Sequence, residues 1–263
     1  MTRWKLFKSR SIAIVAVALL VAATPTGATA QQTRSRGITN IVLVHGAWAD
    51  GSSWSKVIPL LAAKGLHVDA VQLPLTSPAD DVGAVQRAMA RVDGPLLLVA
   101  HSYGGAVITQ AGNDPKVAGL VYVAAFAPAE GESPFQLTVD TLPPFLQNVQ
   151  PDNFGFLKLT EAGIRNDFAP DLSDSEQTVL AATQGPTSVA SLSGVITTPA
   201  WRTKPSWFVI AAHDRVVLPT LQAMFAERMN ATSITLSSSH VAMLSHPYVV
   251  ASFIRRAARD ASN

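Results

Sequence analysis

One serine, Ser102, stands where an apolar run meets a pair of glycines, Gly104 and Gly105. The run Leu96–Ala100 has the composition of a buried strand, and the glycines begin a stretch with helical spacing up to Ala111. So tight a turn between strand and helix admits only small neighbours and exposes the serine hydroxyl at the helix N-terminus. Partial positive charge there stabilises a developing anion, so we predict that Ser102 is a nucleophile. A serine that only caps the helix is the simpler alternative.

A serine nucleophile needs a base, usually a histidine that a carboxylate orients. Four of the six histidines occupy strand-end motifs, the start of a strand or the position before an acid: His45, His101, His67 and His213. His240 follows the last predicted strand, at the sheet edge where α/β sites form. His246 precedes Pro247 and begins the final predicted helix, where a surface or capping role is expected. We therefore predict His240 as the base.

Asp214 is the predicted acid, because it lies just past a strand that ends at Ala211, again at a carboxyl end. A surface-turn aspartate paired with Arg215 is the alternative. Along the chain the order is nucleophile, acid, base: Ser102, Asp214, His240.

Two main-chain N–H groups are expected to stabilise the oxyanion that a serine attack creates. Tyr103, the residue after the nucleophile, is expected to supply one, and Ala47, in the loop after the first strand, the other. Gly46 lets the backbone come close. Trp48 and Trp54 are candidates to line the substrate pocket, although buried tryptophans often belong to the core.

Predicted strands that alternate with predicted helices must position these residues. The strands are Ile41–Val44, His67–Val71, Leu96–Ala100, Val117–Ala124, Ser206–Ala211 and Ser233–Leu236. The helices are Ser53–Ala63, Ser77 to about Val92, Gly104–Ala111, one after Pro219, and about Pro247–Ala258. Such alternation predicts an α/β fold with a roughly six-stranded, mostly parallel sheet and helices on both faces.

The alternation stops between about residues 128 and 204, where several prolines interrupt the chain. Helical stretches are expected there only near Glu161–Phe168 and from Ser173 to Gln184. We interpret this segment, rich in Phe, Leu and Trp, as a small cap insertion over the open end of the sheet.

The first 30 residues have the layout of a secretory signal peptide. Basic residues precede the uninterrupted apolar run Ile12–Ala23, and Ala28-Thr29-Ala30 follows. As a helix, the run would be about 18 Å long, shorter than the roughly 30 Å that a membrane anchor must span. We expect cleavage after Ala30, a mature domain of residues 31–263, and a secreted or periplasmic protein without a membrane anchor.

Composition excludes several classes of protein. The chain has 263 residues, 48% hydrophobic and 14% charged, which is too apolar for a disordered protein. Because it contains no cysteine, disulfides, thiolate metal sites and a cysteine nucleophile are excluded. Beyond residue 30 the chain carries 16 basic and 18 acidic residues, so no nucleic-acid partner is expected. No metal or organic cofactor is implied, and the sequence carries no signal for the oligomeric state.

Together these motifs resemble the α/β-hydrolases, in the compact branch with plant methyl esterases, hydroxynitrile lyases and small bacterial serine esterases. The residues that carry the resemblance are Val42–Trp48, Ala100–Gly105, Val121–Pro128, Asp214-Arg215 before Pro219, and Ser239-His240. The resemblance covers Ile41 to Ala258 and implies the fold and the order Ser102, Asp214, His240. Ala100 stands where the family usually has glycine, and alanine is small enough for the turn.

The resemblance implies a serine hydrolase that cleaves small carboxylic esters through an acyl-enzyme, and the apolar cap favours hydrophobic or aromatic esters. Similar lyases carry a lysine beside the catalytic histidine and a threonine after the first-strand histidine, where this chain has Val241 and Gly46. Dehalogenases and epoxide hydrolases of the fold use an aspartate nucleophile, which Ser102 excludes. The alternatives are hydroxynitrile lysis, C–C bond hydrolysis or perhydrolysis with the same triad, and a hydrolase-like ligand-binding protein.

Overall fold

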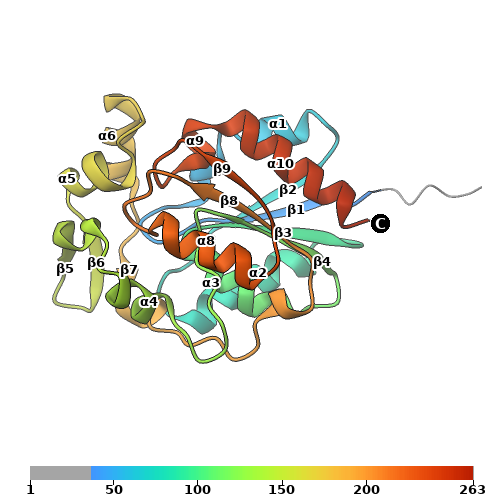
Figure 1. Ribbon diagram of the computed structural model, residues 1–263, viewed down its shortest axis with the longest axis horizontal. Coiled ribbons are helices and arrows are strands. Elements are labelled where there is room, and N and C mark those ends of the chain that lie inside the picture. Colours follow the sequence, from blue (N-terminus) through green and yellow to red (C-terminus); the bar gives the residue numbers. More distant parts are fainter. Residues whose placement is uncertain (1–36, 263) are drawn as a thin grey trace, which may run out of the picture. The chain divides into compact units, whose positions relative to one another are not determined.

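Six parallel strands form the central sheet, in the order β2-β1-β3-β4-β8-β9 (Figure 1). The computed structural model describes residues 37–262. The strands are β1 (Asn40–Val44), β2 (His67–Val71), β3 (Leu96–His101), β4 (Val117–Val123), β8 (Ser206–Ala211) and β9 (Thr232–Leu236). The middle strands are almost entirely apolar and buried, as expected for a parallel sheet covered on both faces. The predicted α/β sheet is confirmed.

Helices cover both faces of this sheet (Figure 1). On one face lie α1 (Ile58–Ala62) and α10 (Pro247–Asp260), and on the other lie α2 (Pro78–Ala90), α3 (Gly104–Ala111) and α8 (Pro219–Arg228). The sequence predicted one helix over Ser53–Ala63, which is wrong in its first half. There the chain makes a 3₁₀ turn, Gly51–Trp54, and α1 begins only at Ile58, with Pro59 in its first turn.

The insertion between about residues 128 and 204 contains more structure than the two predicted helices. It has a three-stranded antiparallel sheet in the order β5-β6-β7, made of β5 (Val149–Pro151), β6 (Phe156–Leu159) and β7 (Thr187–Ser188). Its helices are α4 (Pro134–Thr141), α5 (Glu161–Gly163), which continues as a π-helical turn (Ile164–Phe168), α6 (Asp174–Thr183) and α7 (Val189–Leu192). The small sheet and α4 were not predicted. The strands of this sheet are too short to show an alternating pattern.

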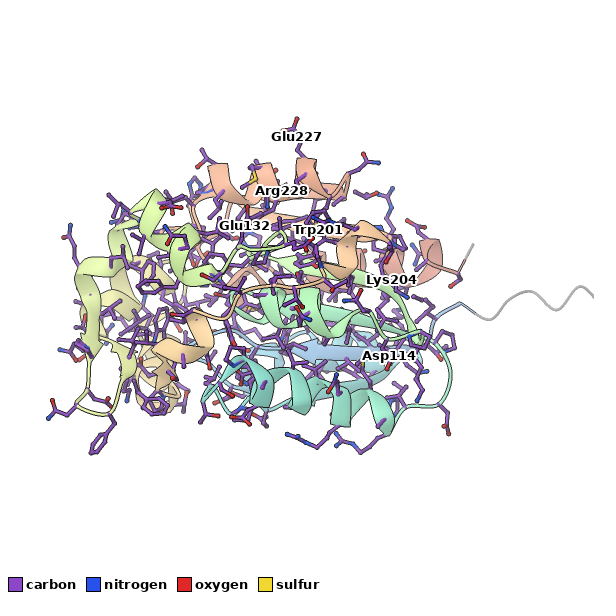
Figure 2. The ribbon with its side chains drawn as sticks, turned by 90° about the horizontal axis from the view of Figure 1, so that it is seen from below. Asp114, Glu132, Trp201, Lys204, Glu227 and Arg228 are labelled. Atoms are coloured by element: carbon purple, nitrogen blue, oxygen red, sulfur yellow. The ribbon has the colours of Figure 1, made fainter. Side chains whose placement is uncertain are left out.

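Polar contacts anchor the base of the insertion to the core. Arg228, at the end of α8, pairs with Glu132 over an N–O distance of 2.7 Å, and both are labelled in Figure 2. Nearby, the indole N–H of Trp201 donates to the carbonyl of Pro128 at 3.0 Å, which joins the two ends of the insertion.

Among residues 37–262, no helix combines the length and the apolar character needed to cross a membrane. The predicted signal peptide, residues 1–30, lies outside the described residues, and its cleavage stays a prediction.

Candidate active site

Ser102 lies in the turn between β3 and α3 with φ of +53°, a left-handed conformation that costs energy for a residue with a side chain. Neighbouring glycines make room for this turn. A Cβ on Gly46 would lie 2.5 Å from the Cβ of Ser102, and one on Gly104 would lie 2.4 Å from the carbonyl oxygen of His45. The first-strand loop therefore lies against Ser102, and the start of α3 lies against the end of β1, each too closely for a side chain at its glycine.

The structure brings Ser102, His240 and Asp214 together. Their side chains follow β3, β9 and β8, three strands whose carboxyl ends lie at the same edge of the sheet. His240 Nε2 lies 2.8 Å from Ser102 Oγ, and His240 Nδ1 lies 2.7 Å from Asp214 Oδ2. All three residues are buried. This geometry allows the serine hydroxyl to donate to Nε2 while the Nδ1–H donates to the carboxylate, an arrangement that can activate the serine.

The carboxylate of Asp214 is held by three further donors. The N–H groups of Val216 and Val217 donate to Oδ1 at 2.8 and 3.0 Å, and the side-chain amide of Gln222 donates to Oδ2 at 2.8 Å. Gln222, from α8, is fully buried and accepts the N–H of Ala211 at 2.9 Å. Gln222 was not among the predicted site residues, and the one signal for it in the sequence is a polar residue within the apolar face of a helix.

Asp214 is not paired with its neighbour. The guanidinium of Arg215 contacts the carboxylate of Asp167 instead, at 2.7 Å. The surface-turn alternative considered for Asp214 therefore does not describe this residue.

Two other histidines near the site, His101 and His45, form hydrogen bonds with main-chain groups. His101 Nε2 lies 2.9 Å from the carbonyl oxygen of His240, so this nitrogen carries the hydrogen and donates it. His45 Nε2 accepts the N–H of Leu73, and its Nδ1–H donates to the carbonyl of Gly46. Burial lowers the pKa of both imidazoles, that of His101 well below its ordinary value of 6.5. Both rings are neutral and fix the loops on either side of Ser102.

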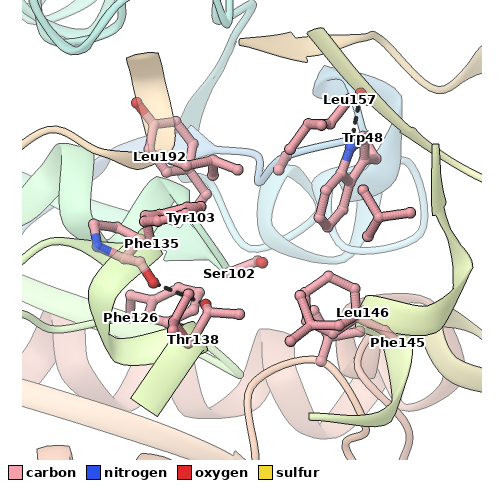
Figure 3. Close-up of a pocket in the computed structure, with 15 residues that line it drawn as sticks. Trp48, Ser102, Tyr103, Phe126, Phe135, Thr138, Phe145, Leu146, Leu157 and Leu192 are labelled. Carbon is pink, nitrogen blue, oxygen red and sulfur yellow. Dashed lines mark hydrogen bonds between the residues drawn. The ribbon is translucent and has the colours of Figure 1, made fainter. Parts of the chain in front are cut away.

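Ser102 faces a cavity with mostly apolar walls (Figure 3). The sheet side contributes Ala47, Trp48, Tyr103, Phe126 and Val216, and the insertion contributes Pro134, Phe135, Thr138, Val139, Phe145, Leu146, Val149, Leu157 and Leu192. Part of the insertion therefore lies over the open end of the sheet.

Of the other predicted site residues, Ala47, Tyr103 and Trp48 line this cavity and Trp54 does not. The main-chain N–H groups of Ala47 and Tyr103 form no hydrogen bond with another residue of the described chain. The indole of Trp48 donates to the carbonyl of Leu157 at 3.0 Å, which fixes it against the insertion. Trp54 is fully buried in the hydrophobic core, so its prediction as a pocket residue is wrong.

Within residues 37–262, no three His, Cys, Asp or Glu side chains are grouped so that they could hold a metal ion.

Comparison with known proteins identifies the family. Residues 41–253 match the model of the alpha/beta hydrolase family. The chain belongs to the α/β-hydrolases. The resemblance inferred from the strand-end motifs is thereby confirmed.

Several α/β-hydrolases are similar to this one. A pyrethroid hydrolase from Sphingobium wenxiniae is 37% identical over 110 residues, which cover 37% of this chain and 39% of that protein. A carbendazim hydrolyzing esterase from a Nocardioides species is 33% identical over 123 residues, 41% of this chain and 50% of that one. This chain therefore spans half or less of the length of these two curated relatives. The crystal structure of a pyrethroid hydrolase from Sphingobium faniae JZ-2 superimposes with a TM-score of 0.73 at 25% identity, covering 84% of this chain and 97% of that one.

Proposed function

We propose that the protein is a serine esterase that hydrolyses small, hydrophobic carboxylic esters through an acyl-enzyme. The observation that carries the proposal is the continuous chain of hydrogen bonds from Ser102 through His240 to Asp214, at the wall of an apolar cavity. A buried serine in contact with an oriented imidazole is the arrangement that serine hydrolases need. The similarity to enzymes named as a pyrethroid hydrolase and a carbendazim hydrolyzing esterase supports the same reaction class.

In the acylation step, Ser102 Oγ attacks the ester carbonyl carbon while His240 Nε2 accepts the hydroxyl proton. The Asp214 carboxylate accepts a hydrogen bond from the His240 Nδ1–H and stabilises the imidazolium that forms. When the tetrahedral intermediate collapses, the bond to the alcohol oxygen breaks and His240 returns the proton to that oxygen. Water then attacks the acyl-enzyme with His240 again as base, and the carboxylic acid leaves Ser102.

The N–H groups of Ala47 and Tyr103 are the proposed oxyanion donors. Both residues lie beside Ser102 on the cavity wall, and neither N–H is engaged elsewhere within residues 37–262. One such donor contributes about 10²–10³ in rate in serine hydrolases. His45 helps to hold the loop that carries Ala47, because its ring donates a hydrogen bond to the Gly46 carbonyl in that loop.

The cavity supports a hydrophobic substrate. Its walls are aromatic and aliphatic side chains, with Ser102 and Thr138 among its few polar members. An apolar acyl or aryl group gains free energy by leaving water for such a surface, whereas a charged group loses its hydration there.

Ester hydrolysis is favoured over cyanohydrin cleavage by two positions. Beside the imidazole stands Val241, which is apolar and buried, so no lysine is available there to stabilise cyanide. Gly46 occupies the other discriminating position, and a threonine there would bring its Cβ within 2.5 Å of Ser102.

The experiment that tests the proposal replaces Ser102 with alanine in an assay on a short-chain chromogenic ester. We expect kcat/KM to fall at least about 10³-fold, because the nucleophile is lost while the cavity remains. A suitable control is Ser206→Ala, which removes another buried serine at the start of β8, outside the cavity. Undiminished hydrolysis by Ser102→Ala would end the assignment of the nucleophile.

We also propose that the chain is exported and that its first 30 residues are removed. This proposal is supported by the layout of residues 1–30, which is that of a signal peptide. Measuring the mass of the N-terminal peptide of the secreted protein tests it.

A further inference from the structure

We infer that two aspartates of the insertion, Asp167 and Asp171, are positioning residues for the triad, each holding one of the loops that carry Asp214 and His240. The inference rests on the proposed function for its effect on catalysis. Neither residue lines the cavity or contacts Ser102.

Asp167 holds the loop that carries Asp214. Its side chain is 2% exposed and accepts hydrogen bonds from Arg215 Nε and from Asn148 Nδ2, both at 2.7 Å. Arg215 is the residue after Asp214, and the next two residues, Val216 and Val217, donate their main-chain N–H groups to the Asp214 carboxylate. A partly buried, charge-assisted contact one residue from the acid therefore tethers the turn that carries Asp214.

Asp171 holds the loop that carries His240. Its Oδ2 accepts the main-chain N–H of Ser239 at 2.8 Å, and its Oδ1 accepts the Ser239 hydroxyl. Ser239 immediately precedes His240, so these two bonds act one peptide unit from the imidazole. On the other side of the residue, His101 holds the carbonyl of His240.

Between the two aspartates, Phe168 packs on the imidazole itself. Its ring is edge-on to that of His240, with centroids 5.1 Å apart, and it is almost fully buried. The segment follows a π-helical geometry, closed by the Ala169 N–H to the Ile164 carbonyl at 2.8 Å. Such single π-helical turns often occur at functional sites.

The insertion thus contacts both loops through two residues that are four positions apart in its own sequence, whereas their partners in the core, Arg215 and Ser239, are 24 positions apart. A displacement of about 1 Å between reacting groups is enough to slow an enzyme by about 10²-fold. Loosening either contact should therefore reduce the rate of the chemical step and leave the binding of substrate in the cavity intact.

The test compares Asp167→Asn and Asp171→Ala with the parent enzyme. We expect kcat to fall about tenfold in each and KM to stay within about twofold, because neither residue lines the cavity. Asp171→Asn, which retains an acceptor oxygen for Ser239, should have intermediate activity. The matched control is Glu130→Gln, which breaks another 2.7 Å ion pair of the insertion, with Arg202, away from the triad.

A double-mutant cycle shows whether Asp167 acts through Arg215. Arg215→Gln, a change at a half-exposed side chain, should reduce kcat as Asp167→Asn does, and the two together should reduce it no further. The Arg215→Gln variant alone also tests this contact if Asp167→Asn does not fold. Additive effects, or a KM that rises while kcat is unchanged, would overturn the inference.

A readout without substrate separates this inference from the proposed function. The proton on His240 Nδ1, bonded to Asp214, should give a downfield NMR resonance in the parent protein. We expect it to broaden in Asp167→Asn and Asp171→Ala and to persist in Glu130→Gln. If that pattern appears in a protein that hydrolyses no ester, the proposed function fails and the positioning role stands. If the resonance and kcat are unchanged in the folded variants, the positioning role is wrong.

Discussion

The imidazoles of His101 and His240 lie 4.5 Å apart between ring centroids, and only His240 contacts the Ser102 hydroxyl. His101 donates from Nε2, and its buried Nδ1 has no partner in the described part of the chain. A second positive charge so close to a catalytic imidazolium would oppose proton transfer to it. Keeping His101 neutral therefore protects the role proposed for His240.

The neutrality of His101 predicts a pH dependence of stability. Burial holds its pKa in the folded protein well below 6.5, so the unfolded chain binds a proton that the folded chain does not. As the pH falls below about 6.5, the free energy of unfolding should decrease, by up to about 1.4 kcal/mol per pH unit from this group. His101→Asn should show a shallower decrease between pH 6.5 and 5 in urea unfolding. Equal slopes in the two proteins would contradict this account.

Among single residues, those with a distinctive pattern in the adjacent sequence could be predicted. Ser102 was visible from its glycines, and Asp214 and His240 from their places after strands. Gln222 and the two insertion aspartates were not visible, because their contacts with the catalytic loops join segments distant in sequence. The prediction that Trp54 lines the pocket was wrong because a tryptophan near a loop has the same local sequence pattern whether it faces a cavity or the core.

Among the elements, α3 has to lie unusually close to the sheet for Ser102 to reach the cavity. Gly105 makes this possible, since a Cβ at that position would lie 2.2 Å from the carbonyl oxygen of Phe126 and 2.9 Å from the side chain of Ala125. The two consecutive glycines in the sequence are thus explained by contacts with two different segments, one for each glycine.

We predict that Gly105→Ala destabilises the protein by about 1–3 kcal/mol, because α3 must move away from the segment after β4. The same shift displaces Ser102, so kcat should also fall. Gly83→Ala in α2 is the control: the nearest atom to its added methyl is the end of the flexible Arg87 side chain at 3.3 Å. In a helix this change is expected to stabilise by up to about 1 kcal/mol. Thermal unfolding and ester assays on both variants check the difference, and equal stabilities would refute the packing argument.

The four middle strands of the central sheet, β1, β3, β4 and β8, were predictable because largely apolar runs next to glycine or proline leave little choice of structure. The small sheet of the insertion was not, because its strands have two to four residues and are fixed by contacts with the core. One such contact is the N–H of Ser188 bonded to the carbonyl of Leu75 at 2.8 Å.

Over the whole described molecule, the central sheet carries Ser102, Asp214 and His240, and the insertion supplies most of the cavity wall. The insertion also contacts the loops that carry Asp214 and His240, through Asp167 and Asp171. The proposed substrate cavity and the loops that carry Asp214 and His240 therefore both contact one segment of the chain, whereas a lid would only cover the site.

The central claim is that Ser102 is a nucleophile activated by His240. Its most direct test is the intact mass of the protein after reaction with a fluorophosphonate, followed by peptide mapping. We predict one adduct per chain, on Ser102, and a rate of labelling at least about 10³-fold lower in His240→Ala. An adduct at another residue, or equal labelling rates in the parent protein and His240→Ala, would contradict the claim.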